Sequence, residues 1–205
     1  MTFTFIIMTL FVVMSPGIDT ALITKRTIAD GRIAGFQMAF GITVGSLVHT
    51  VAATLGLSAL LLQSALAFTI LKLIGAIYLI YLGIKAFLQK KDLLQNPEQL
   101  NEVKHKSAFQ EGLLSNILNP KVIIFFLTFL PQFVTNSNNV MGQFILMGCT
   151  YALLSIIWFV MYVICLYYIR EWLLSPKIQN WMEKATGLVL VGFGIKLLFT
   201  KANNV

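Results

Sequence analysis

Charged residues are scarce in this chain of 205 residues, because Asp, Glu, Lys and Arg together make up only 11% of it. Ordinary soluble domains contain about 25% charged residues. Apolar residues account for 58% of the chain, and the longest polar stretch, residues 89–107, reads as a surface loop. The sequence therefore leaves no room for a separate soluble domain and indicates an integral membrane protein.

Motifs for nucleotide, metal and thiol chemistry are also missing. The chain has no Walker sequence, no dinucleotide-binding glycine fingerprint, no Cys-x-x-Cys and no His-Glu-x-x-His. Its two cysteines, Cys149 and Cys165, fall in one apolar stretch, where a straight helix keeps them too far apart for a disulfide. We expect no cofactor and no bound metal, so any active transport would have to use an ion gradient.

Long apolar stretches dominate what remains, and six of them are long enough to be transmembrane helices. They cover residues 3–24, 34–63, 65–88, 109–134, 142–169 and 182–200. The sequence therefore predicts an all-α polytopic membrane protein with six transmembrane helices.

The net charge of +7 follows the topology of these helices and does not indicate a nucleic-acid partner. Eleven of the fifteen Lys and Arg residues lie at the first, third and fifth loops, whereas the fourth loop, residues 135–142, has none. The positive-inside rule then places the odd-numbered loops in the cytoplasm and both termini outside.

Two short patterns predict that the second half of the chain repeats the first. Gly83-Ile-Lys and Gly194-Ile-Lys each end a predicted helix, and Ser15-Pro16-Gly17 has a counterpart in Asn119-Pro120-Lys121. Three helices per half is an odd number, so the halves would run in opposite directions through the membrane, as in many secondary transporters. We predict one transmembrane domain over residues 1–205, with repeat 1 at about 1–88, a cytoplasmic loop at about 89–108 and repeat 2 at about 109–205.

The two proline-containing patterns lie inside predicted membrane helices. Lysine in the middle of a membrane helix costs roughly 2.5–3.5 kcal/mol, and proline removes a backbone hydrogen bond. Ser or Asn followed by Pro is typical of a helix start. Ser15-Pro16 and Asn119-Pro120 therefore each predict a half-helix whose positive end favours a carboxylate. The alternative is a pair of packing kinks.

Asp19 lies one turn beyond Pro16 and is an acidic group inside the predicted membrane region. Such a group usually faces a cavity, binds a cation or relays protons. It could hold the ammonium group of a substrate or carry a coupled proton. Alternatively, it caps a helix that resumes at Thr20, or pairs with Lys25 or Arg26.

Lys121 lies too far from the membrane surface for its side chain to reach water. It could bind a carboxylate or neutralise Asp19 in an ion pair. A regular helix turns Lys121 about 200° away from Asn119, whereas Asn116 and Asn119 share one face.

His49 lies one turn beyond Gly45 in the second stretch, and the Gly41-x-x-x-Gly45 pattern allows another helix to approach closely. A histidine titrates near physiological pH, so His49 could take part in proton coupling. The alternative is a hydrogen-bonded packing residue.

These residues resemble the lysine exporter superfamily, specifically its homoserine/threonine efflux branch (LysE/RhtB type), over essentially the whole chain. The resemblance rests on Ser15-Pro-Gly-Ile-Asp-Thr20, Gly41-x-x-x-Gly45, Tyr78-Leu-Ile-Tyr-Leu-Gly83, Asn116-Ile-Leu-Asn-Pro-Lys121 and Phe129-Leu-Pro-Gln-Phe133. Two positions depart from the family pattern. Ile18 replaces the second proline of a typical Pro-Gly-Pro, and Ser46 stands where many members carry an acidic residue.

The resemblance implies a bacterial inner-membrane protein, not an enzyme, that exports amino acids or close derivatives with the proton gradient. We expect one half to rock against the other, and the glycine faces permit a homodimer. The expected substrate-binding residues are Pro16, Gly17, Asp19, Asn116, Asn119, Pro120 and Lys121. The candidates for proton coupling are Asp19 and His49.

Two other functions remain open at this point. One is cation efflux, although a single carboxylate and one histidine make a poor site for a divalent ion. The other is a membrane-embedded enzyme or assembly factor, for which His49 near Ser46 is a thin basis. The residues do not say which amino acid an exporter would carry.

Overall fold

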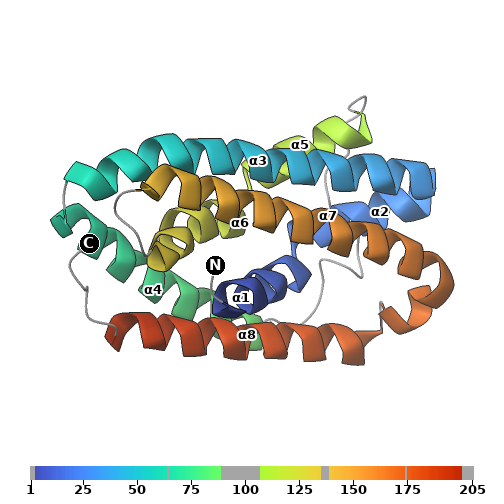
Figure 1. Ribbon diagram of the computed structural model, residues 1–205. Coiled ribbons are helices and arrows are strands. Elements are labelled where there is room, and N and C mark those ends of the chain that lie inside the picture. Colours follow the sequence, from blue (N-terminus) through green and yellow to red (C-terminus); the bar gives the residue numbers. More distant parts are fainter. Residues whose placement is uncertain (1–2, 64, 89–106, 135–138, 174, 200–205) are drawn as a thin grey trace.

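The computed structural model describes residues 3–63, 65–88, 107–134, 139–173 and 175–199, and every element in that part of the chain is helical (Figure 1). The elements are α1 (Phe3–Met14), α2 (Ile18–Asp30), α3 (Arg32–Gln63), α4 (Ala65–Leu88), α5 (Ala108–Ile117), α6 (Pro120–Ile124), the π-helical turn η2 (Phe125–Phe129), the 3-10 turn η3 (Leu130–Phe133), α7 (Val140–Leu173) and α8 (Pro176–Phe199). Each predicted apolar stretch is therefore helical. Most of the predicted loop at 89–108 lies outside the described residues.

Two of these helices are each long and apolar enough to cross a membrane, namely α3 over Arg32–Ser58 and α7 over Val140–Leu166. Two bent pairs raise the number to four if each pair is one span: α1 with α2, bent by 51°, and α5 with the segment Pro120–Phe133, bent by 48°. Within α4, the stretch Leu73–Lys85 is apolar but is too short to count as a span by itself. Six spans therefore stay a prediction.

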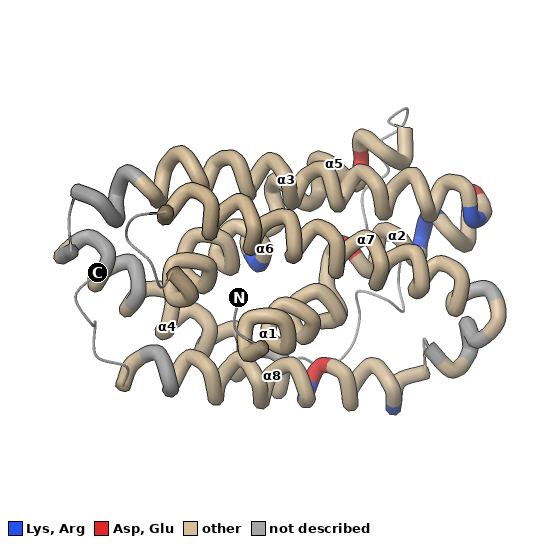
Figure 2. The backbone as a smooth tube through the Cα atoms, in the orientation of Figure 1, with Lys and Arg blue, Asp and Glu red and all other residues tan. Residues whose placement is uncertain are grey.

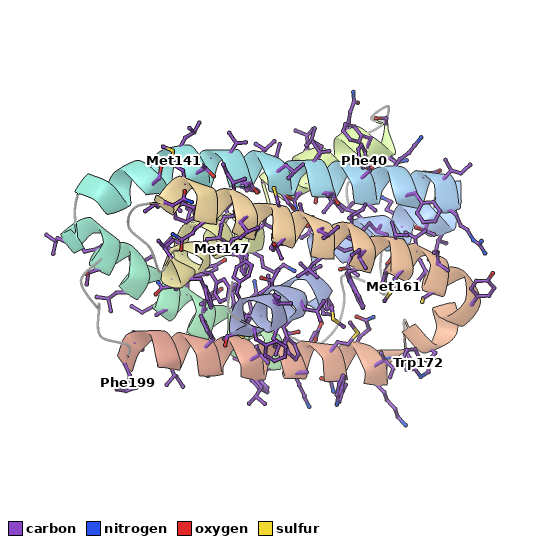
Figure 3. The ribbon with its side chains drawn as sticks, in the orientation of Figure 1. Phe40, Met141, Met147, Met161, Trp172 and Phe199 are labelled. Atoms are coloured by element: carbon purple, nitrogen blue, oxygen red, sulfur yellow. The ribbon has the colours of Figure 1, made fainter. Side chains whose placement is uncertain are left out.

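Large apolar side chains point outward from the bundle, which is the pattern of a protein surrounded by lipid. Phe40, Met141 and Phe199 are 58%, 51% and 82% exposed, whereas Met147 is buried. Figure 3 shows Phe40, Met141 and Phe199 along the outside of the bundle. Exposing this much apolar surface to water is unfavourable, whereas exposing it to the hydrocarbon chains of lipids is not.

The closest helix pairs join the two halves of the sequence. α4 packs along α8, and α3 packs along both α5 and α7 (Figure 1). Two apolar cores result. The first is built around α1, η2, α4 and α8 with the start of α7, and the second lies between α2, α3 and the end of α7.

Glycines bring α4 and α8 together. A Cβ atom on Gly83 of α4 would lie 2.5 Å from the Val191 side chain and 2.7 Å from the Gly187 carbonyl of α8. In return, a Cβ atom on Gly194 of α8 would meet Ile80 and the Ala76 carbonyl of α4, at 2.6 and 2.9 Å. The helices approach this closely because the small residues leave room.

These two sets of contacts are related by one shift along the sequence. The Gly-Ile-Lys patterns are 111 residues apart (194 − 83), and the same shift carries Ile80 to Val191 and Ala76 to Gly187. The residues of α8 that Gly83 contacts are therefore the sequence counterparts of the residues of α4 that Gly194 contacts. Such reciprocal contacts are expected if a two-fold axis relates the two halves.

Candidate substrate-binding site

The fourth predicted helix breaks where the sequence predicts. Asn119 is the N-cap of α6, and its side chain accepts a hydrogen bond of 3.0 Å from the Lys121 backbone N–H. Pro120 occupies the first helical position, where its missing N–H costs nothing. Asn and Pro therefore make the helix start, as expected.

The first predicted helix also breaks, but not with Ser15 as cap and Pro16 as first residue, so that prediction is wrong. The Ser15 N–H still donates to the Phe11 carbonyl at 3.0 Å, so Ser15 belongs to the end of α1. Gly17, in an extended conformation, is the N-cap of α2, which begins at Ile18. The alternative that Asp19 caps a helix beginning at Thr20 is wrong as well.

Lys121 bonds to the end of α1. Its Nζ donates to the carbonyl oxygens of Val12 and Ser15, both at 3.2 Å. The last carbonyl oxygens of a helix have no hydrogen-bond donor within the helix, and they carry the partial negative charge of its C-terminal end. Lys121 therefore caps α1 from another helix. It forms no ion pair with Asp19 within 4 Å, although the two charges attract each other at longer range.

Asp19 bonds to the end of α5. It is 5% exposed, and its carboxylate accepts hydrogen bonds from Ser115 Oγ at 2.9 Å and from Asn116 Nδ2 at 3.0 Å. Its place in the first turn of α2 adds a favourable interaction with the positive helix end. Each charge thus bonds to the helix that ends at the other break: Lys121 to the end of α1, and Asp19 to the end of α5.

Asn116 connects Asp19 to α3. Its side-chain oxygen lies 3.4 Å from the Ser46 hydroxyl, which donates to it, and its backbone carbonyl accepts a hydrogen bond of 3.1 Å from His49 Nε2. Gly45 makes this possible, because a Cβ atom there would lie 2.8 Å from the Asn116 side chain. The close approach predicted from the glycine pattern is therefore confirmed.

The structure brings most of the predicted site residues together, and of the two prolines only Pro120 takes its predicted place at a helix start. The two helix breaks bring together Gly17, Asp19, Asn116 and Lys121. His49 is linked to them by its hydrogen bond to the Asn116 carbonyl. Pro120 is exposed and acts through the backbone. Asn119 is 3% exposed, and its Nδ2 is buried without a hydrogen-bond partner.

Ser115 and the carbonyls of Val12 and Ser15 are missed by sequence reasoning. Ser115 directly precedes the conspicuous Asn116, but a serine in an apolar helix gives no signal of its own. Ser46 stands out in the sequence as a departure from the family pattern and as a neighbour of His49, but not as a partner of Asn116. In the structure it is fully buried and holds the Asn116 side chain.

Among the charged side chains that the structure describes, Asp19 is the one that is fully buried, and Lys121 is half-buried. Figure 2 shows blue on α6 in the middle of the bundle, and blue on α2 and α3 near the end where those helices meet. There Arg26 pairs with Asp30 and Glu111, both at 2.7 Å. The hydrogen bonds to Asp30 and Glu111 raise the pKa of Arg26, so this link between α2 and α5 stays charged.

Comparison with known proteins gives the family context of this site. The LysE type translocator family matches residues 10–201. The membrane protein YrhP of Bacillus subtilis, described as uncharacterized, is 38% identical over 90% of this chain and 91% of its own length. Uncharacterized membrane proteins of Vibrio cholerae and Pseudomonas aeruginosa are 30% and 28% identical, over 92% and 95% of this chain and 92% and 93% of their own. No solved structure matches.

Proposed function

The chain belongs to the LysE type translocator family of multi-pass membrane proteins, and on this premise we propose that it is a secondary active exporter of an amino acid or a close derivative. The observation that carries the proposal is the presence of two opposite charges, the half-buried Lys121 and the buried Asp19, held apart at two helix breaks. A zwitterion is the solute that complements both charges at once.

In the proposed binding mode the Lys121 ammonium receives the carboxylate of the substrate. Gly17 has no side chain, which leaves space beside this ammonium group. A Cβ atom at Gly17 would lie 3.4 Å from Lys121 Nζ and would occupy part of that space. The unpartnered Nδ2 of Asn119 supplies a second donor for the same carboxylate. Asp19 receives the ammonium group, while Pro16 and Pro120 keep the backbone open at the breaks.

Binding would change the partners of Lys121. A carboxylate is a stronger acceptor than a backbone carbonyl, so the substrate takes the ammonium group from Val12 and Ser15 and releases the end of α1. We propose that this exchange opens the site on one side of the membrane. The helix break is the natural hinge, because few backbone hydrogen bonds cross it.

Protons would enter at the other charge. The Asn116 carbonyl can only accept, so His49 donates to it from Nε2. We propose that a proton reaching Asp19, with His49 as carrier, neutralises the carboxylate and releases the substrate ammonium. Export is then driven by the proton gradient.

The moving parts would mix the two halves of the sequence. Rocking of residues 1–88 against residues 109–205 would pull α4 from α8 and α3 from α5, which are the closest helix pairs. We propose instead that α4 and α8 move together against the group of α2, α3, α5 and α7. The reciprocal contacts of Gly83 and Gly194 support an inverted repeat. Such a repeat would make the state open to the cytoplasm and the state open to the outside structurally equivalent. The odd-numbered loops face the cytoplasm in this scheme.

Purified protein in liposomes tests the function. A panel of amino acids is loaded inside or outside, and flux is followed under an imposed pH gradient. Substrate-dependent proton movement is the expected result. Flux of divalent cations without amino-acid flux would favour cation efflux, and no flux of any solute would favour a membrane enzyme or an assembly factor.

Replacing Asp19 by Asn is expected to abolish proton-coupled export while the protein still folds. The amide oxygen of an asparagine can accept from Asn116 Nδ2, and its NH₂ group can donate to the Ser115 hydroxyl, so both contacts survive. Only the charge is lost. Flux in liposomes and thermal unfolding in detergent are measured together. An Asp19→Asn protein that still moves protons with substrate would remove Asp19 from the coupling step.

A further inference from the structure

A small cavity lies beside Lys121, between α1, α4, α6 and α8. It has room for about one water molecule. Leu79 and Leu82 of α4, Phe125 of η2 and Leu190 of α8 form its apolar walls. The cavity therefore joins the charged end of the proposed site to the interface between α4 and α8.

Among the described residues that line this cavity, Lys121 is the one charged side chain, and none of them carries a carboxylate. Its uncharged polar lining consists of the hydroxyl-bearing residues Ser15 and Thr186. A cationic side chain placed here would lose its water without gaining a partner of opposite charge, which is strongly unfavourable. An anionic side chain would compete with the substrate's own α-carboxylate for Lys121, the same ammonium group. An aliphatic side chain would be favourably buried.

Both walls of the cavity belong to elements that move in the proposed cycle. Leu79 and Leu190 lie where α4 crosses α8, and Ser15 belongs to the end of α1 that Lys121 holds. When a carboxylate takes the Lys121 ammonium from Ser15, α1 can separate from α4 and α8 and the cavity widens. Carboxylate binding and side-chain entry are then one event.

We infer that this cavity receives the side chain of the substrate and that the exported solute is a neutral amino acid with an aliphatic side chain, such as leucine or valine. The inference rests on the proposed function and names the substrate class of the same site. It excludes lysine, arginine, glutamate and aspartate as preferred substrates.

The test changes the size of the cavity at Leu82, which is only partly buried and so tolerates replacement better than Leu79. Leu82→Phe reduces the space, and Leu82→Ala enlarges it. Export of alanine, valine, leucine, methionine and lysine is measured for each protein in liposomes. Leu188→Phe and Leu188→Ala are the matched controls, because Leu188 lies on α8 but is 67% exposed.

We expect Leu82→Phe to shift the preference toward valine and alanine, and Leu82→Ala to shift it toward methionine, each by about tenfold in relative kcat/KM. The Leu188 variants keep the wild-type order. A purely structural role for Leu82 would lower all rates together and leave their ratios unchanged, and that result would overturn the inference. Where Leu82→Phe does not fold, Leu82→Ala alone decides between these outcomes.

The two proposals fail differently. Export of lysine or glutamate by the wild-type protein at rates equal to leucine would reject the aliphatic class and leave the exporter assignment intact. An absence of flux for every amino acid would reject the exporter assignment itself.

Discussion

Replacing Lys121 by Met is expected to lower kcat/KM for export by at least about 30-fold. Removing one partner of a buried, hydrogen-bonded charge pair typically costs 2–5 kcal/mol, and 1.4 kcal/mol is a factor of ten. Methionine keeps most of the volume and the apolar stem of the side chain. The loss should therefore come from the missing ammonium group, which the substrate carboxylate requires.

Lys121 also holds α1, so the same variant must be examined for a structural defect. The two bonds to Val12 and Ser15 are expected to contribute about 1–3 kcal/mol to stability. Lys121→Arg, which keeps the charge, should retain the cap of α1 and recover part of the flux. A Lys121→Met protein that exports normally, with only a lowered melting temperature, would show that Lys121 is a cap and not a ligand.

Replacing Gly41 by Ala is expected to destabilise the folded protein by more than about 3 kcal/mol and to remove most of it from the membrane fraction. A Cβ atom at Gly41 would overlap the Phe109 carbonyl and lie 2.9 Å from the Leu113 backbone nitrogen. Backbone atoms cannot turn aside as a side chain can. The helices α3 and α5 must separate, and overpacking of this kind is costly.

The control for this substitution lies on the same helix. Gly56 is exposed, and a Cβ atom there would meet nothing within 4 Å. Gly56→Ala should therefore be neutral or stabilise α3 by about 0.5–1 kcal/mol. Thermal unfolding in detergent measures both variants. Equal melting temperatures for Gly41→Ala and Gly56→Ala would contradict the close contact between α3 and α5.

The sequence predicts a local feature well where one short segment contains the whole cause. Asn119 and Pro120 meet the requirements of a helix start within two residues, and the structure has the start there. Ser15 and Pro16 meet the same requirements but do not start a helix. The difference is tertiary, because the Ser15 carbonyl bonds to Lys121, 106 residues away.

The partners of the two charges could not be predicted from their neighbours. Asp19 bonds to Asn116, 97 residues along the chain, and the sequence offers Lys25, Arg26 and Lys121 as more obvious partners. Which polar groups meet depends on how closely α3 and α5 approach, and that approach depends on glycines. The glycine pattern indicates a contact but does not name the helix that makes it.

The two carbonyls that hold Lys121 also bear on how the protein avoids leaking. They are hydrogen-bond acceptors for the ammonium group that belong to the protein itself. Loading is then an exchange of one partner for another, and the charge never stands bare in a medium of low dielectric constant. No column of water is required to stabilise it between cycles. In the proposed exporter, such a bundle would not leak ions between transport cycles, so the proton gradient would be used only for export.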